Sequence, residues 1–97
     1  MYKNFLNLQI VVFLIYEIKN NGLKNWENCL KIVENANNYE LPLPVRERND
    51  KLIEYCKLRI KTYQTIVKAI EQNTNIYDNE INNYNVQVEK IINELQK

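Results

Sequence analysis

Cysteine thiols, tyrosine hydroxyls and carboxylates are the side chains of this chain that could do chemistry. The chain contains no histidine and no serine, so neither a Ser-His nor a Cys-His nucleophile can form, and the commonest metal ligand is missing. The two cysteines, Cys29 and Cys56, stand 27 positions apart without a CxxC spacing, which does not suit a zinc site. We interpret Cys56 as a free thiol that packs like a small hydrophobic side chain, with a structural disulfide or a reactive thiol as the alternatives.

The carboxylates are not arranged for catalysis either. Glu71, Glu80 and Glu89 recur every nine residues, a spacing that rotates them around a helix instead of gathering them on one face. A di-iron carboxylate site would need Glu-x-x-His motifs, which a chain without histidine cannot supply. A single glycine is too few for a phosphate-binding loop. We therefore expect no enzyme, no catalytic, cofactor-binding or metal-ligating residue, and no cofactor.

Length and charge narrow the range of partners. Lysine and arginine together number 13 and aspartate and glutamate 12, and the resulting net charge of +1 creates no field that would attract nucleic acid. A chain of 97 residues is long enough for one small domain with one core. The composition thus favours a single domain over residues 1–97 that binds protein and no nucleic acid.

The strongest pattern in the chain is a heptad of apolar residues that runs from Ile53 to Leu95. Thirteen positions follow alternating steps of three and four, and twelve of them are apolar or aromatic. No glycine or proline interrupts the chain between Val45 and Lys97. The pattern predicts one long helix over about residues 45–95.

The long helix has one weak point, at residues 73–75. Asparagine and threonine are poor helix formers there, so a kink or a helical hairpin is the alternative to a continuous helix. We favour the continuous helix because Tyr77, Ile81 and Tyr84 keep the phase of the preceding heptad, whereas a tight loop is expected to reset it.

Two shorter helices are expected before the long one. The apolar segment from Phe5 to Ile18 predicts a helix over about residues 4–20, with a strand as the alternative because part of it is rich in β-branched residues. Its longest apolar run is seven residues, well below the roughly 17 to 25 of a membrane span. Gly22 is expected to end this helix as a left-handed cap. The spacing of the following apolar residues predicts a second helix over about residues 23–36.

A proline-containing loop is expected over residues 37–44. Pro42 and Pro44 disfavour helix in the residues before them, and Pro44 suits the first turn of the helix that follows. The sequence as a whole therefore predicts an all-α fold in which two shorter helices pack on one long helix.

The outer half of the long helix is the candidate functional site. The two shorter helices are expected to cover its first half, which leaves the second half short of cover and open to a partner helix or a second copy of the chain. Tyrosines in place of leucine argue against a tight two-stranded coiled coil. The candidate interaction stripe consists of Thr74, Tyr77, Ile81, Tyr84, Val88, Ile91 and Leu95. The predicted function is a non-enzymatic interaction module; the alternative is a small exported or membrane-peripheral protein directed by the apolar N-terminal segment.

Part of the chain resembles a known family. The segments from Gly22 to Ile32 and from Leu41 to Asn85 are similar to the soluble helical tail that follows the membrane domain in some bacterial rhomboid-family intramembrane proteases. The positions that carry the resemblance are Pro44, Arg48, Asn49, Tyr55, Cys56, Leu58, Arg59, Tyr63, Ala69, Ile70 and Tyr77. The family's serine and histidine are absent here, so no catalytic position transfers.

The resemblance implies a non-catalytic accessory module. Such a module would lie in the cytoplasm, or on the cytoplasmic side of a membrane if it is attached to a parent membrane protein. It would associate with a membrane only through a membrane domain upstream of this chain.

Overall fold

The computed structural model describes residues 12–96, and over this range the protein is all-α and has no strand. Residues 12–17 are helical and continue through a π-helical turn, η1 (Ile18–Leu23), into α2 (Lys24–Ala36). Two further helices follow, α3 (Leu43–Gln72) and α4 (Asp78–Leu95). The predicted all-α class is confirmed. The start of the first predicted helix, before residue 12, lies outside the described residues.

The boundary that we predicted between the two short helices does not exist. The backbone is α-helical on both sides of η1, at Glu17 and at Lys24, and Gly22 does not adopt a positive φ. Residues 12–36 therefore form one helical stretch, interrupted only by a π-helical turn. Position 22 requires a glycine for another reason: a Cβ added there would lie 2.5 Å from Cε2 of Tyr63 on α3. The glycine lets η1 pack closely on α3 instead of ending a helix.

The loop between α2 and α3 is slightly shorter than predicted and covers residues 37–42. Pro42 is extended, with φ −54° and ψ 147°, and Pro44 lies in the first turn of α3. A buried side chain joins the two helices beside this loop. Nδ2 of Asn49 on α3 donates hydrogen bonds to the carbonyl oxygen of Val33, at 3.0 Å, and to Oδ1 of Asn37, at 2.7 Å. These bonds hold the start of α3 against the end of α2.

The continuous long helix that we favoured is wrong, and the chain forms the alternative hairpin. Asn73 adopts a left-handed conformation with φ 49° and ψ 56°, the only positive φ among the described non-glycine residues. The amide of Thr74 donates to the carbonyl of Ala69 at 3.0 Å, and that of Asn73 to the carbonyl of Ile70 at 3.1 Å. This bonding pattern is the Schellman motif, which satisfies the last carbonyls of a helix and turns the chain away from its axis.

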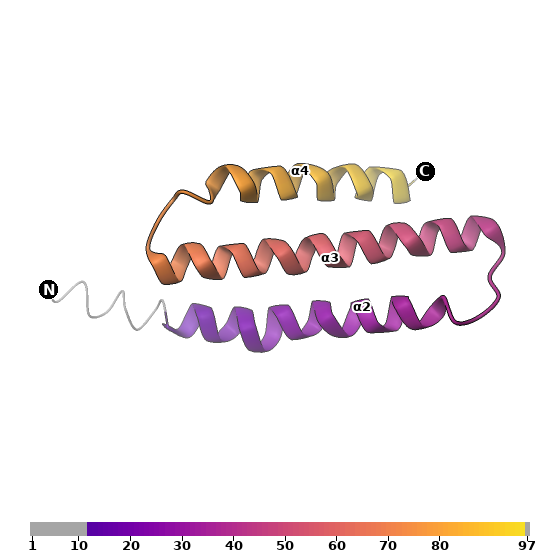
Figure 1. The fold of residues 1–97 in the computed structure, drawn as a ribbon, viewed down its shortest axis with the longest axis horizontal. Coiled ribbons are helices and arrows are strands. Elements are labelled where there is room, and N and C mark those ends of the chain that lie inside the picture. The colour runs from indigo at the N-terminus through magenta and orange to yellow at the C-terminus, as the bar shows by residue number, and fades with distance from the viewer. Residues whose placement is uncertain (1–11, 97) are drawn as a thin grey trace, which may run out of the picture.

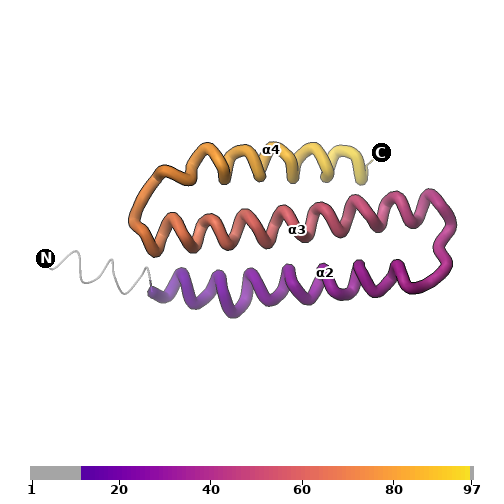
Figure 2. The backbone as a smooth tube through the Cα atoms, in the orientation of Figure 1, coloured from indigo at the N-terminus to yellow at the C-terminus, as the bar shows by residue number. Residues whose placement is uncertain are grey.

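The three helices lie side by side in one layer, with α3 in the middle and α2 and α4 on either side of it (Figure 1, Figure 2). Within the described range, α2 and α4 do not contact each other. The 24 Å width agrees with this arrangement, because three helices spaced by about 9 Å are about 24 Å wide. The radius of gyration is 16.8 Å, compared with about 13 Å for a compact domain of similar length.

The arrangement of the helices in one layer explains why the phase of the heptad wrongly predicted a continuous helix. In α3, Cys56 and Tyr63 face η1 and α2, whereas Leu58 lies in a cluster with Val88 and Ile91 of α4. The apolar rows of α3 and α4 are in phase along the sequence, yet the row in α3 packs on α2 and the row in α4 packs on the other side of α3. Continuity of a heptad across a weak segment is therefore no evidence for a continuous helix here.

Candidate interaction surface

The structure places the predicted interaction stripe against α3. Val88 and Ile91 are buried with Leu58, and Tyr84 and Leu95 pack on this cluster. The remaining members, Thr74, Tyr77 and Ile81, are half-buried. The apolar residues of α4, for which the sequence indicated no covering helix, are thus covered by α3 of the same chain. A partner could reach Val88 and Ile91 only if α4 left α3, and binding by the stripe stays a prediction.

Polar contacts add to the packing of α4. The ammonium of Lys51 on α3 forms an ion pair with the carboxylate of Glu94 on α4, and this bond raises the pKa of Lys51. The hydroxyl of Tyr84 donates to Oε1 of Glu80 at 2.7 Å, which is the main cause of a raised pKa for Tyr84. The hairpin is therefore closed both by its small apolar cluster and by an interhelical ion pair.

The two broad sides of α3 differ in their side chains. The rows of α3 that face α2 and α4 are about 160° apart, since Cys56 and Leu58 differ by two residues. On one side of α3, between these rows, lie half-buried Leu52, Ile66 and Ile70. The side chains on the opposite side are polar and exposed: Asp50, Lys57, Lys61, Gln64 and Lys68. We call the first side the apolar face and the second the charged face.

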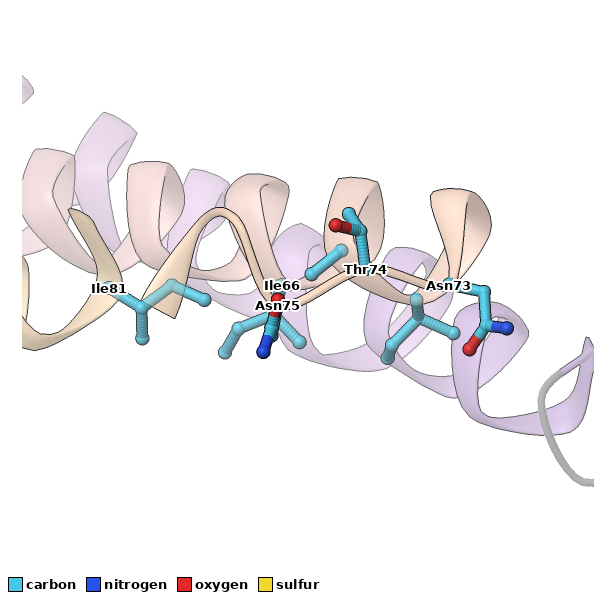
Figure 3. Close-up of a pocket in the computed structure, with 7 residues that line it drawn as sticks. Ile66, Asn73, Thr74, Asn75 and Ile81 are labelled. Carbon is cyan, nitrogen blue, oxygen red and sulfur yellow. The ribbon is translucent and has the colours of Figure 1, made fainter. Parts of the chain in front are cut away.

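The apolar face is hollowed near the loop between α3 and α4. One depression of about 630 Å³ is lined by Ile66, Ala69, Ile70, Asn73, Thr74, Asn75 and Ile81, and Figure 3 shows these side chains. A second depression of about 390 Å³ is lined by Glu17, Ile18, Gly22, Tyr63 and Ile66. Ile66 lines both depressions, and we call the two together the apolar groove. Glu17 is the only charged residue among the described residues that line it.

Aromatic side chains fill the apolar face farther from this loop. The rings of Trp26 and Tyr55 meet edge to face, with centroids 5.3 Å apart and an interplanar angle of 75°. The guanidinium carbon of Arg59 lies 5.8 Å from the Trp26 centroid and 5.5 Å from that of Tyr55. Such cation–π contacts stabilise the stack by about 0.5–1 kcal/mol each at exposed sites. The stack covers this part of the layer and leaves the groove as the open part.

An exposed apolar helix begins next to the groove. Residues 12–17, which we call the apolar arm, lie at the end of the molecule where α3 turns into α4 (Figure 2). The exposed fractions are 61% for Val12, 62% for Phe13, 44% for Leu14 and 61% for Tyr16. Consecutive residues of a helix point in directions 100° apart, so apolar side chains meet solvent on several sides of the arm. The chain passes from the arm directly into Glu17 and Ile18 of the groove.

The two cysteines considered for chemistry interact between α2 and α3 but form no disulfide. Both cysteines are free; Cys29 is exposed, whereas Cys56 is buried and its pKa is raised by that burial. No group of three or more potential metal ligands occurs within residues 12–96. Over the same range, no helix combines the length and hydropathy of a membrane span.

Sequence reasoning noticed part of the apolar face but missed its meaning. Leu52, Tyr55, Leu58 and Ile66 broaden the apolar pattern of α3, and from the sequence we expect the two shorter helices to cover this broad face. The missed signal was a second heptad row on the other side of α3: Tyr55, Leu58, Thr62, Thr65 and Ala69. Its small residues allow α4 to approach closely, and two rows about 160° apart indicate a helix packed on both sides.

No family model, curated protein or solved structure matches the chain. The resemblance to the helical tails of rhomboid-family proteases therefore stays a prediction, and the geometry of the apolar face is the ground for a functional proposal.

Proposed function

We propose that the protein is a non-enzymatic helical module that binds a protein helix in the apolar groove. One observation carries the proposal: within residues 12–96 the three helices form a single layer, so no described helix covers Ile66 and Ile70 on one broad side of α3. In a closed bundle, α2 and α4 would meet and cover these side chains. Here the layer has the form of half a bundle.

Size and chemistry of the face suit a helical partner. An amphipathic helix that lies in an apolar groove buries side chains at helical spacing, a common mode of peptide recognition. Specific interfaces bury about 800 Å² on each partner, and a layer 24 Å wide and about 45 Å long, the length of α3 at 1.5 Å per residue, offers enough surface for this. Apolar burial contributes roughly 25 cal/mol per Å² before the costs of association.

The distribution of charge supports an apolar partner and not a polyanion. Among the described residues the groove has one charged lining residue, Glu17, whereas Lys57, Lys61 and Lys68 of α3 lie on the charged face. A surface for nucleic acid would need those cations beside the groove. When another helix buries the apolar face, the lysines of the charged face stay in solvent. Binding therefore carries no desolvation penalty for these lysines.

Paired substitutions on the two faces test the proposal. Ile70→Asp changes the groove, and Lys68→Asp changes the charged face two residues away on the same helix. We expect the wild type to self-associate in sedimentation equilibrium or to enhance the fluorescence of a hydrophobic dye. Ile70→Asp should weaken that signal and Lys68→Asp should leave it unchanged. A strictly monomeric wild type without dye binding contradicts the proposal, as does an equal response of both variants.

A membrane-peripheral protein is the second candidate, supported by the exposure of Val12, Phe13 and Tyr16. Deletion of residues 2–18 followed by cell fractionation tests it. Loss of membrane recovery on deletion supports this candidate, whereas soluble behaviour of both forms rejects it.

A further inference from the structure

We propose that the helix bound in the apolar groove is the apolar arm of a second copy of the chain, so that two copies exchange their arms about a two-fold axis. The inference rests on the proposed function and names its partner. Its basis is that one chain carries both an open apolar groove and an exposed apolar helix, and that the two lie at the same end of the molecule.

The arm and the groove complement each other chemically. The arm presents Val12, Phe13, Leu14 and Tyr16 to solvent. The groove presents isoleucine, alanine and the ring of Tyr63, bordered at the loop by the polar residues Asn73, Thr74 and Asn75, and Glu17 is the one charged residue among its described lining residues. A two-fold dimer requires a surface that is complementary to itself. In a dimer of this chain, the arm of each copy would bind the groove of the other, which gives two identical contacts.

The arm cannot fill the groove of its own chain. Backbone angles at Glu17 are helical, with φ −63° and ψ −43°, and the helix continues through η1 into α2 without a turn. The arm therefore extends α2 in its own direction, as Figure 1 shows for the start of the described chain. Since the arm points along α2 and does not fold back over α3, residues 12–17 leave Ile66 and Ile70 of their own chain open to the arm of another molecule.

Exchange also accounts for the apolar side chains on several sides of the arm. A groove covers one side of a helix. Because each arm begins beside its own groove, at Glu17 and Ile18, reciprocal docking brings the two arms together near the two-fold axis. Each arm then packs against the partner's groove on one side and the partner's arm on another. The net charge of +1 on each chain adds little repulsion between the copies.

Substitution of Phe13 tests the exchange without disturbing the fold of the single chain. Its side chain is 62% exposed there, so Phe13→Asp should leave the circular dichroism spectrum unchanged, and it should lower the unfolding midpoint only at protein concentrations where the wild type is dimeric. Ile32 on α2 is 71% exposed and lies outside both arm and groove, and Ile32→Asp is the matched control. In sedimentation equilibrium we expect Phe13→Asp to weaken dimerisation by about 100-fold or more, since two phenyl rings lose burial in each dimer. Ile32→Asp should have no effect.

A mixing experiment tests the reciprocity. Ile66→Asp in the groove should weaken the dimer as Phe13→Asp does; if circular dichroism shows that it unfolds the chain, Ile70→Asp replaces it. An equimolar mixture of the arm variant and the groove variant should associate more tightly than either alone. In the mixed dimer, the intact arm of the groove variant meets the intact groove of the arm variant.

Each other outcome overturns the exchange and is informative about the proposed function. If the groove variant dissociates the dimer and Phe13→Asp does not, the groove binds another segment, and the proposed function stands without the exchange. If neither variant changes the association, both proposals fail. If the wild type is monomeric and binds phosphatidylglycerol-containing vesicles, and Phe13→Asp abolishes that binding, the arm serves a lipid surface instead.

Discussion

The ring of Tyr63 packs directly on the backbone of Gly22, with its Cε2 and Cδ2 atoms 2.5 and 2.8 Å from the place where a Cβ would be. We expect Gly22→Ala to destabilise the protein. Overpacking costs about 1–3 kcal/mol, and alanine returns only about 1 kcal/mol of helix propensity. The expected net loss in the free energy of unfolding is up to about 2 kcal/mol, measured by urea denaturation.

A double-mutant cycle separates the clash from the propensity of glycine. In a Tyr63→Ala background the ring is gone, so Gly22→Ala should now stabilise the protein. A loss of similar size in both backgrounds would show that the ring of Tyr63 is not what requires glycine.

The left-handed turn at Asn73 should respond to substitution more than its neighbour in the loop does. A non-glycine residue in this conformation costs about 1–2 kcal/mol, although asparagine tolerates it better than most. Asn73→Gly should therefore raise the free energy of unfolding by several tenths of a kcal/mol, and Asn73→Val should lower it by at least about 1 kcal/mol. Asn75, which lacks a positive φ, provides the control. Equal effects of valine at both positions would argue against the Schellman turn.

Two valines of α4 offer a matched test of its packing on α3. Val88 is 3% exposed and belongs to the cluster with Leu58 and Ile91, whereas Val86 is 64% exposed. Val88→Ala should cost about 2 kcal/mol through lost burial and the cavity left behind, and Val86→Ala should change the free energy of unfolding by no more than about 0.5 kcal/mol. Thermal or urea unfolding measures both. A continuous helix with an unpaired outer half would make the two substitutions equivalent.

The two cysteines should differ sharply in reactivity. Cys29 is exposed, whereas Cys56 is 3% exposed and burial raises its pKa above the ordinary value of 9.0. We expect an alkylating reagent at pH 8 to modify Cys29 rapidly and Cys56 only after unfolding, as mass spectrometry of timed samples would show. Comparable labelling rates in the folded protein would contradict the burial of Cys56.

The raised pKa of Cys56 also has a consequence for stability. Below the pKa of the unfolded state, the thiol is protonated in both states and its contribution is fully present. As pH rises through the folded pKa, the unfolded state has already ionised and that contribution is lost. The stability of the wild type should therefore fall more steeply above about pH 9 than that of Cys56→Ala. Parallel pH profiles would refute this.

The sequence was a good guide to the elements and a poor guide to their arrangement. Helical periodicity correctly indicated helices around Trp26, Tyr63 and Tyr84, and the two prolines located the first loop. The role of Gly22 could not be predicted from the sequence. A glycine that ends a helix and a glycine that makes room for an aromatic ring are the same residue in the sequence. Its role depends on Tyr63, which lies 41 positions away in the chain.

The prediction of a continuous helix through Asn73 was wrong for a different reason. Its weak helix formers were recognised, but the preserved phase of Tyr77 and Ile81 outweighed them. The phase of a heptad indicates which residues would share one side of an uninterrupted helix. It does not indicate which neighbouring helix covers that side. The apolar groove is likewise a product of the layer, since Ile66 is left open only because α2 and α4 stand on opposite sides of α3.

The separation of α2 and α4 is the most direct test of the single layer that leaves the apolar face open. Spin labels on the exposed Cys29 of α2 and on α4 through Glu89→Cys report this separation by pulsed dipolar spectroscopy, and Cys56 stays unlabelled because it is buried. Helices on opposite sides of α3 have axes about 16–20 Å apart, whereas helices in contact have axes about 8–10 Å apart. The single layer predicts the longer separation in the monomer. A distance that requires α2 and α4 to touch would contradict it, because a closed bundle has no apolar groove to offer a partner.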